Sequence, residues 1–235
     1  MNHRIVGVEA LLRLYAKDGT LIPPSAFIPV AEEIGLIKEI GDWVLLNSCK
    51  SISDWHRKYP EDSSLNLHVN ISVKQLCPGF IGRMKEILEI THLEPARLRL
   101  EITENIFMEN VEQLSTIMEQ LSLLGIQMVI DDFGTGYSSL GYIRRFPIDT
   151  IKLDQSFILR LQNDWKNVEF TKAIVMLATQ LGLDTIAEGV ETEEQEDCLT
   201  KLKCHFGQGF LFSKPLDIEK LEELLDRSRE LERNE

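Results

Sequence analysis

The sequence predicts an α/β fold in which parallel strands and outer helices close into a (β/α)8 barrel. Short strand-like runs alternate with longer helical patterns along the chain. No glycine-rich turn directly follows the first run, which disfavours an open doubly wound sheet. The predicted strands are Arg4–Leu11, Leu65–Ser72, Arg97–Thr103, Ile126–Asp131, Thr150–Leu153, Thr185–Glu188 and Gln208–Phe212. Because eight strands close such a barrel, we expect its first strand to be missing.

The helical patterns lie between and after these strands, where a barrel requires covering helices. The predicted helices are Ser25–Ile34, Ile40–Lys58, Gly79–Ile90, Val111–Leu124, Asn167–Leu181, Glu193–Leu202 and Ile218–Leu231. The regular alternation, without a linker or low-complexity tract, predicts a single domain over residues 1–235.

The amino-acid composition and net charge argue against some classes of function. The 235 residues are 43% hydrophobic, enough for a sizeable core, and carry a formal net charge of −13. This charge argues against a general nucleic-acid binder and against docking on anionic membranes. The apolar start Ile5–Leu12 is interrupted by Glu9, and no uncharged run approaches the ~20 residues that span a bilayer. We therefore expect a cytoplasmic protein without a signal peptide, membrane segment or DNA partner.

The four cysteines show neither a disulfide framework nor paired zinc knuckles. They are Cys49, Cys77, Cys198 and Cys204. A metal site formed by Cys198, Cys204 and His205 is a minor alternative, because free cysteines are commonly buried small hydrophobes. Reduced thiols in a cytoplasmic protein are the simpler interpretation.

The predicted strand Leu65–Ser72 has two different faces. Its apolar residues alternate with polar ones that include His68 and Asn70. In an antiparallel sheet the polar face would meet solvent, whereas in a barrel it fills the interior and points to the mouth near the strand end. We expect His68 to be a hydrogen-bonded interior residue rather than a metal ligand.

Polar and charged residues recur where the predicted strands end. They are Glu9, Asn70, Glu101, Asp131, Asp132, Lys152 and Glu188. Catalytic groups of (β/α) barrels come from these carboxyl ends, and hard oxygen ligands suit Mg²⁺ or Mn²⁺. Converging carboxylates repel one another unless cations neutralise them. The pattern therefore predicts a metal-dependent barrel enzyme.

The adjacent acids Asp131 and Asp132 suggest two ions, one of them bridging. Two-metal sites favour in-line displacement at phosphorus. Lys152 would deprotonate the attacking water, or orient it and stabilise charge. The following segment, Phe133–Ser139, contains glycines such as Gly134 that permit a tight turn with backbone N–H groups directed at a phosphate.

Taken together, these segments resemble the EAL domain family of cyclic di-GMP phosphodiesterases. The naming motif stands as Glu9-Ala10-Leu11, followed by Arg13. The other matching segments occur in the family's order and are Val69–Ser72, Glu101–Glu104, Asp131–Leu140, Ile151–Asp154, Ala187–Thr192 and Gln208–Pro215. The resemblance covers almost the whole chain and implies a TIM-like barrel of the EAL type.

The resemblance implies roles for the strand-end residues. The implied metal ligands are Glu9, Asn70, Glu101, Asp131, Asp132 and Glu188. Among them Asp131 bridges two ions, with Asp132 and Glu188 toward the second. Lys152 matches the residue that contacts or activates the attacking water. Glu104 matches a glutamate that steadies the loop after Asp131.

Substrate contacts are also implied. Arg13, Gln208, Leu11 and Gly134 match positions that line the substrate, and a guanidinium suits a phosphate. Glu191 and Asp154 would support the ligands from behind. The residues alone leave other interpretations open. Glu9 and Arg13 would serve equally as an exposed acid and its surface partner, Glu191 as a helix cap, and Gln208 as an ordinary loop amide.

The implied reaction opens cyclic di-GMP to linear pGpG with two Mg²⁺ or Mn²⁺ ions, and Ca²⁺ is expected to inhibit. Cyclic di-GMP is the implied partner, with homodimerisation and an upstream sensory or cyclase-like domain as further expectations. Family members usually carry a helix and a strand ahead of Glu9, so we expect an N-terminally truncated EAL domain. Two alternatives stay open: a non-catalytic cyclic di-GMP receptor, and a protein-interaction module.

Overall fold

The computed structural model describes residues 4–60, 64–104, 111–135, 143, 145–161 and 164–232. The chain separates into two compact units. Unit 1 comprises residues 1–100, 123–126 and 217–235, and unit 2 comprises residues 101–122 and 127–216.

The main sheet has the hydrogen-bonded order β1-β4-β5-β6-β7-β8-β9. Its strands are β1 (Gly7–Ala10), β4 (Asn66–Asn70), β5 (Leu98–Thr103), β6 (Gln127–Phe133), β7 (Thr150–Leu153), β8 (Asp184–Ala187) and β9 (Phe206–Gly207). The pairs β1–β4, β6–β7, β7–β8 and β8–β9 are parallel. The predicted parallel α/β sheet of seven strands is confirmed.

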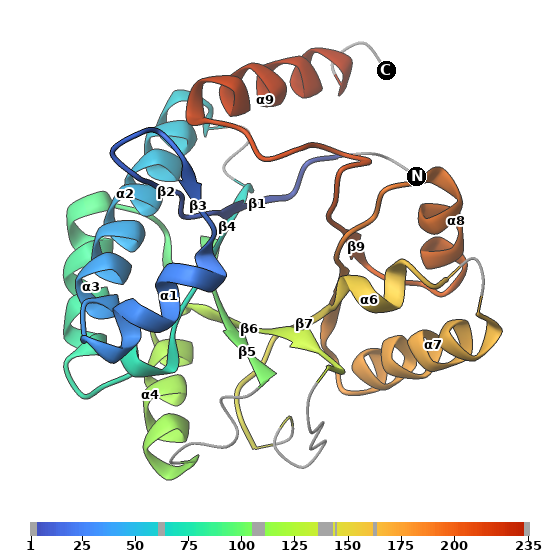
Figure 1. Ribbon diagram of the computed structural model, residues 1–235, viewed down its shortest axis with the longest axis horizontal. Helices are drawn as coiled ribbons and strands as arrows, with labels where there is room; N and C mark the ends of the chain where they lie inside the picture. Colours follow the sequence, from blue (N-terminus) through green and yellow to red (C-terminus); the bar gives the residue numbers. More distant parts are fainter. Residues whose placement is uncertain are drawn as a thin grey trace. The chain divides into compact units, whose positions relative to one another are not determined.

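Unit 1 combines β1, β4 and the start of β5 with four longer helices. They are α1 (Pro24–Glu33), α2 (Ile37–Lys58), α3 (Phe80–Thr91) and α9 (Ile218–Glu232). Helix α2 packs on β4 and on α3 (Figure 1). A short antiparallel hairpin, β2 (Leu14–Tyr15) and β3 (Leu21–Ile22), follows β1. This hairpin was not predicted, because its two-residue strands have no periodicity.

Unit 2 contains the end of β5, the strands β6 to β9 and the helices that follow them. These are most of α4 (Val111–Leu123), α6 (Gln155–Ile158), α7 (Trp165–Gln180) and α8 (Glu193–Lys201). Helix α7 packs on β8 and on α6 (Figure 1). Thr192 is the N-cap of α8, and its side chain and that of Gln195 form a reciprocal capping box.

Alternation along β5 places a core face beside a polar face. Leu98, Leu100 and Ile102 are buried, and so are Arg99 and Glu101 between them. Both faces are therefore covered, as in a parallel sheet enclosed by helices. This confirms that the polar face of such a strand lies inside the protein rather than in water.

The last predicted strand, Gln208–Phe212, is wrong. The structure places β9 at Phe206–Gly207 and makes the later residues a turn in which Phe212 N–H donates to Gly209 C=O. Leu211 N–H donates to Val190 C=O, so this segment follows the loop after β8. Gly209 lies so close to the backbone of Val190 that any Cβ there would overlap it.

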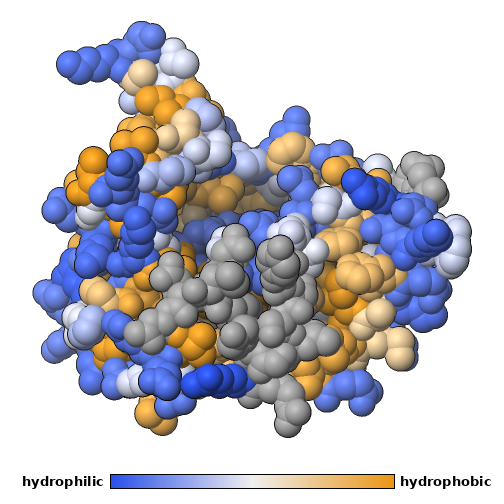
Figure 2. Space-filling view, turned by 60° about the horizontal axis from the view of Figure 1, so that its bottom comes forward, coloured by the Kyte–Doolittle hydropathy of each residue, from blue (hydrophilic) through white to orange (hydrophobic). Residues whose placement is uncertain are grey.

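Hydrophilic residues cover much of the face drawn in Figure 2, with hydrophobic side chains interspersed among them. This agrees with a chain in which 27% of the residues are charged. Scattered exposed apolar residues are normal for folded proteins. No helix in the described part of the chain is long and apolar enough to cross a membrane.

Candidate metal and active site

The end of β6 carries a β-bulge. Ile130 pairs with Ile151 and Phe133 pairs with Leu153, so three steps along β6 match two steps along β7. Asp131 and Asp132 therefore both stand opposite Lys152. A bulge of this kind bends a strand and redirects its side chains.

The backbone conformation of Asp132 permits the bulge. Its φ is 53°, in the left-handed region that aspartate tolerates better than most residues. In a regular strand, neighbouring side chains would point to opposite faces. Here an oxygen of Asp131 and one of Asp132 lie within 4.8 Å of each other and of an oxygen of Glu188. Asp132 N–H also donates to Asp131 Oδ1 at 3.0 Å.

Lys152 is the buried centre of this acidic group. Its side chain is 0% exposed, and its Nζ lies 2.6 Å from Glu188 Oε1 and 3.0 Å from Glu101 Oε2. Asp131 Oδ1 is 3.6 Å away. The Glu101 side chain is equally inaccessible, whereas Asp131 and Glu188 are partly open to solvent. The cluster thus has a closed lysine end and an accessible carboxylate end.

Acidic groups gather closely around one buried lysine here. Among the described residues, the carboxylates of Glu101, Asp131, Asp132 and Glu188 lie around the ammonium of Lys152 or beside one another. Carboxylates held at short range repel one another, and a bound cation lowers that cost. Closely spaced carboxylate oxygens are the ligands that Mg²⁺ and Mn²⁺ prefer. The donor set therefore fits a divalent cation at the Asp131, Asp132 and Glu188 end.

Glu104 holds the turn that follows the two aspartates. Its Oε2 accepts a hydrogen bond of 3.0 Å from Gly134 N–H, and the Glu104 side chain is buried. Gly134 has a φ of 95°, a conformation that favours glycine. The predicted contact between Glu104 and this loop is thus present at Gly134, whereas residues 136–142 lie outside the described residues.

In unit 1, the first two strands bring together a second predicted pair. Glu9 pairs with His68 across β1 and β4, and Asn70 Nδ2 donates to Glu9 Oε1 at 2.6 Å. The contact joins two side chains at the carboxyl ends of parallel strands, as the sequence predicted. His68 is buried, as expected for an interior residue. The roles of Glu9 and Asn70 as ligands stay predictions.

The predicted substrate-contacting residues are accessible to different degrees. Arg13 is exposed, with its guanidinium donating to Leu12 C=O at 3.0 Å, and Leu11 is also exposed. Gln208 is held by its backbone, because its N–H donates to Ala187 C=O and its C=O accepts from Val190 N–H. No contact among the described atoms tests their substrate roles, which stay predictions.

Two residues expected to support the ligands have local backbone contacts, and their supporting role stays a prediction. Asp154 caps α6, accepting a hydrogen bond of 3.0 Å from Ser156 N–H. Glu191 is exposed, and its N–H donates to Gln195 Oε1 at 2.7 Å. The cap of α8 is Thr192, so the alternative that Glu191 caps this helix is wrong. Because Asp154 caps α6 directly after Leu153, the last residue of β7, it marks the point where the strand gives way to the helix.

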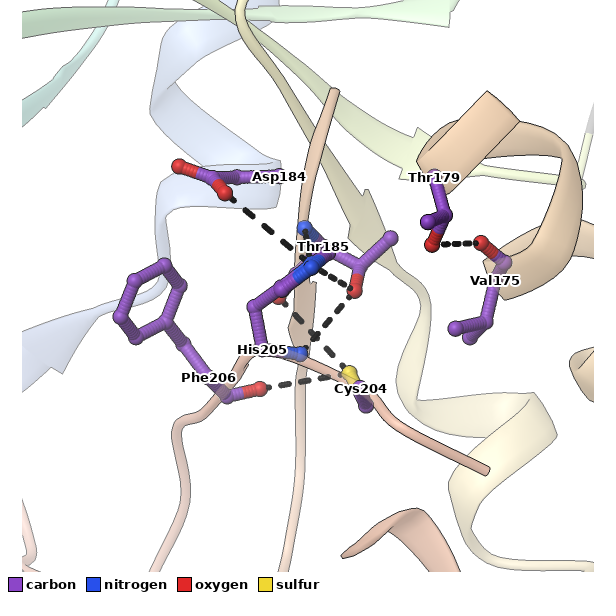
Figure 3. Close-up of polar contacts among 7 residues, drawn as sticks. All are labelled: Val175, Thr179, Asp184, Thr185, Cys204, His205 and Phe206. Carbon is purple, nitrogen blue, oxygen red and sulfur yellow. Dashed lines mark hydrogen bonds and ion pairs between the residues drawn. The ribbon is translucent and has the colours of Figure 1, made fainter. Parts of the chain in front are cut away.

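The cysteine and histidine cluster forms a link between β8 and β9 (Figure 3). Thr185 N–H donates to His205 Nδ1 at 3.0 Å, so the lone pair of that nitrogen is already used. Cys204 Sγ donates to the carbonyl oxygens of Thr185 and Phe206, at 3.7 and 3.4 Å. Burial raises the pKa of the Cys204 thiol and opposes the thiolate that a metal requires. These contacts favour a structural link over the alternative metal site.

Replacing Thr185 with valine is expected to destabilise unit 2 by about 1–3 kcal/mol. The buried Thr185 hydroxyl accepts from His205 N–H at 3.2 Å and contacts His205 Nδ1 at 3.0 Å, and valine keeps the shape but loses both. Urea denaturation measures the change. The matched control is Thr179→Val on α7, whose exposed hydroxyl bonds only Val175 C=O (Figure 3). It should change stability by less than about 0.5 kcal/mol, and equal losses would contradict the prediction.

Sequence patterns missed the short helix α6, which lies directly after the strand that carries Lys152. Asp154, with a hydroxyl residue two positions later, resembles a helix N-cap and is the signal that would have located it. Its single turn carries Gln155 and Phe157, which contact the turns behind the carboxylates. A four-residue helix leaves no periodicity to detect.

Comparison with known families decides what this arrangement is. The sequence model of the EAL domain matches residues 1–215. The chain belongs to the EAL domain family. The signalling protein YkoW of Bacillus subtilis is 41% identical over 225 residues, covering 95% of this chain and 28% of YkoW. MucR of Pseudomonas aeruginosa, a bifunctional diguanylate cyclase and cyclic di-GMP phosphodiesterase, is 42% identical over 221 residues, covering 94% of this chain and 32% of MucR.

Solved EAL structures share the fold. The MucR phosphodiesterase in complex with cyclic di-GMP superposes with a TM-score of 0.86 at 42% identity, covering 92% of this chain and 87% of that chain. The EAL domain of FimX from Pseudomonas aeruginosa, bound to cyclic di-GMP, gives 0.79 at 27% identity, with coverages of 87% and 81%. The predicted TIM-like α/β fold of the EAL type is thereby confirmed. The chain spans about a third of the length of the curated relatives it matches.

Proposed function

We propose that this EAL domain hydrolyses one phosphodiester bond of cyclic di-GMP and releases linear pGpG. The observation that carries the proposal is the cluster of Asp131, Asp132 and Glu188, whose oxygens lie within 4.8 Å of one another beside the buried Lys152. Support comes from MucR, which is named a bifunctional diguanylate cyclase and cyclic di-GMP phosphodiesterase and which matches 94% of this chain with 32% of its own length.

The carboxylates of Asp131, Asp132, Glu188 and Glu101 would hold two Mg²⁺ or Mn²⁺ ions. When bound, such ions stabilise charge on the attacking and leaving oxygens of an in-line displacement. Asp131 would contribute to holding both ions. The family resemblance adds Glu9 and Asn70 to the ligands. We expect Ca²⁺ to permit binding but to inhibit turnover, because its larger, more flexible coordination shell positions the water poorly.

Lys152 serves to orient water and stabilise charge rather than to act as the base. Its ammonium donates to Glu101 at 3.0 Å and pairs with Glu188 at 2.6 Å, which places a positive charge beside two of the proposed ligands. In the overall reaction the water oxygen bonds to phosphorus, one P–O ester bond breaks, and a proton from the water ends on the leaving ester oxygen, which becomes a hydroxyl. Arg13 and Gln208 contact the substrate in this proposal, with Leu11 and the backbone of Gly134 beside them.

The deciding experiment incubates the chain with cyclic di-GMP and Mn²⁺ or Mg²⁺ and follows pGpG by chromatography and mass spectrometry. Turnover is expected, with loss on chelation and in the Glu9→Ala variant. A guanine-free cyclic dinucleotide should react much more slowly. If Ca²⁺-loaded wild type bound cyclic di-GMP in calorimetry while wild type and Glu9→Ala were equally inactive with Mn²⁺, the enzyme proposal would fall and the receptor alternative would stand.

A further inference from the structure

The short helix α6 touches the turns behind both groups of metal-binding carboxylates. These turns are Gly134, two residues after Asp132, and Gly189, directly after Glu188. Both glycines have positive φ, 95° and 70°. Each is closely approached by one side chain of α6, Phe157 at Gly134 and Gln155 at Gly189.

The approach of Phe157 to Gly134 leaves no room for a side chain. A Cβ placed on Gly134 would lie 2.7 Å from Phe157 Cζ and 2.8 Å from Cε2. The other side of the same peptide is fixed by the 3.0 Å hydrogen bond from Gly134 N–H to Glu104. The turn after Asp131 and Asp132 is therefore held between a ring and a carboxylate.

The contact at Gly189 is of the same kind. A Cβ placed there would lie 2.7 Å from Gln155 Cβ, and the preceding Glu188 N–H donates to Leu153 C=O at 3.0 Å. The backbone of Glu188 is thus aligned on β7, while the next residue rests on α6. The short helix serves as a common support for both turns.

Helix α6 is itself fixed in unit 2 by several contacts. Asp154 caps its start, and Asn167 Nδ2 donates to Phe157 C=O at 2.5 Å. The Phe157 ring stacks on Phe170 of α7 with centroids 5.4 Å apart. A side chain so anchored resists displacement, which suits a group that has to set a spacing.

We propose that Phe157 is a positioning residue that sets the separation of Asp131 and Asp132 from Glu188, and thereby the affinity of the site for divalent ions. The inference rests on the proposed function for its catalytic consequence only. Supporting residues behind metal ligands commonly change metal affinity or activity by about 10- to 100-fold. Phe157 acts through Gly134 and touches no ligand atom in this account.

The test measures Mn²⁺ affinity by calorimetry without substrate, beside stability and turnover. Phe157→Ala is expected to weaken Mn²⁺ binding by about 10- to 100-fold, and Phe157→Leu to recover part of the loss. Trp165→Ala is the matched control, because it removes an exposed aromatic side chain of α7 but leaves the stack of Phe157 on Phe170 in place. Its Mn²⁺ affinity should stay within about twofold of the wild type, well inside that range.

A double-substitution cycle separates contact from general packing. Gly134→Ala should weaken Mn²⁺ binding in the wild type, and the penalty should be about tenfold smaller in the Phe157→Ala background, where only the strain of positive φ remains. Unchanged Mn²⁺ affinity in a folded Phe157→Ala variant, or equal penalties in both backgrounds, would overturn the inference. Wild-type protein that binds Mn²⁺ but lacks turnover would refute the proposed reaction alone.

Discussion

Asp131→Asn is expected to lower turnover of cyclic di-GMP on the order of a thousandfold, equivalent to about 4 kcal/mol of transition-state stabilisation. The substitution keeps the volume and the oxygen that accepts Asp132 N–H, but it removes the charge of the proposed bridging ligand. Both ions lose a charged partner at once, and their stabilisation of the reacting oxygens falls. Steady-state kinetics with Mn²⁺, together with Mn²⁺ titration, measures the two effects.

The same variant should behave oppositely when chelator removes all metal. Three carboxylates then remain around Lys152 instead of four, so repulsion falls and unfolding should need no less urea than in the wild type. Added Mn²⁺ should stabilise the wild type more than the variant. Asp197→Asn, on the exposed side of α8, is the control with the same charge change and should leave turnover and metal stabilisation unaltered. Full activity in Asp131→Asn would refute the bridging role.

Lys152→Met is expected to destabilise the protein by about 3–5 kcal/mol and to abolish turnover. The methionine fills a similar volume, but it leaves the fully buried carboxylate of Glu101 without the ammonium that lies 3.0 Å away. Removing one partner of a buried ion pair costs far more than removing an exposed pair, because the remaining charge stays desolvated. Urea denaturation in chelator measures this cost without a metal contribution.

Two further variants make the Lys152 prediction specific. Lys172→Met removes an exposed lysine of α7 that lies 3.6 Å from Glu169, and should change stability by less than about 0.5 kcal/mol. Adding Glu101→Gln to Lys152→Met also removes the buried negative charge of the Glu101 carboxylate. The double variant should therefore recover a large part of the lost stability. A double variant no more stable than Lys152→Met would show that the loss comes from packing.

The parallel sheet was predictable because buried strands show a regular pattern of apolar residues in the sequence. The predicted strand Arg97–Thr103 and the observed β5, Leu98–Thr103, differ by one residue. Its apolar positions alternate strictly, and parallel pairing in an enclosed sheet follows from the intervening helices. Helix α7 was placed within two residues, because its pattern is long and periodic.

The last strand was predicted at the wrong residues, because the sequence of β9 looks less like a strand than the aromatic segment that follows it. The aromatic run Phe210–Phe212 looks strand-like, whereas β9 is only two residues long. What places β9 is a set of tertiary contacts, since His205 and Thr185 bond each other across the pair. Gly209 must also fit against the Val190 backbone. Neither contact is visible in local periodicity.

The candidate site was predictable in its membership but less so in its geometry. Adjacent aspartates and a lysine at successive strand ends indicated convergence, and the structure brings Asp131, Lys152 and Glu188 together. The left-handed φ of Asp132 was not predictable, because most residues could occupy that position in an ordinary strand. The single-domain expectation and the substrate contacts stay predictions.

The bulge in β6 determines which face of the sheet the side chains after Ile130 occupy. Paired residues of parallel neighbours share a face, so Ile130 and Phe133 both lie on the side of Ile151 and Leu153, away from Lys152. Without the extra residue, odd and even positions would exchange roles after Ile130, and the ring of Phe133 would turn toward the lysine. Substitutions at Asp131 or Asp132 keep the number of residues in the bulge, although at Asp132 the new residue must also adopt the left-handed φ. Deleting either one would turn Phe133, the last residue of β6, to the opposite face, so the count of residues between Ile130 and Phe133 is itself a determinant of the site.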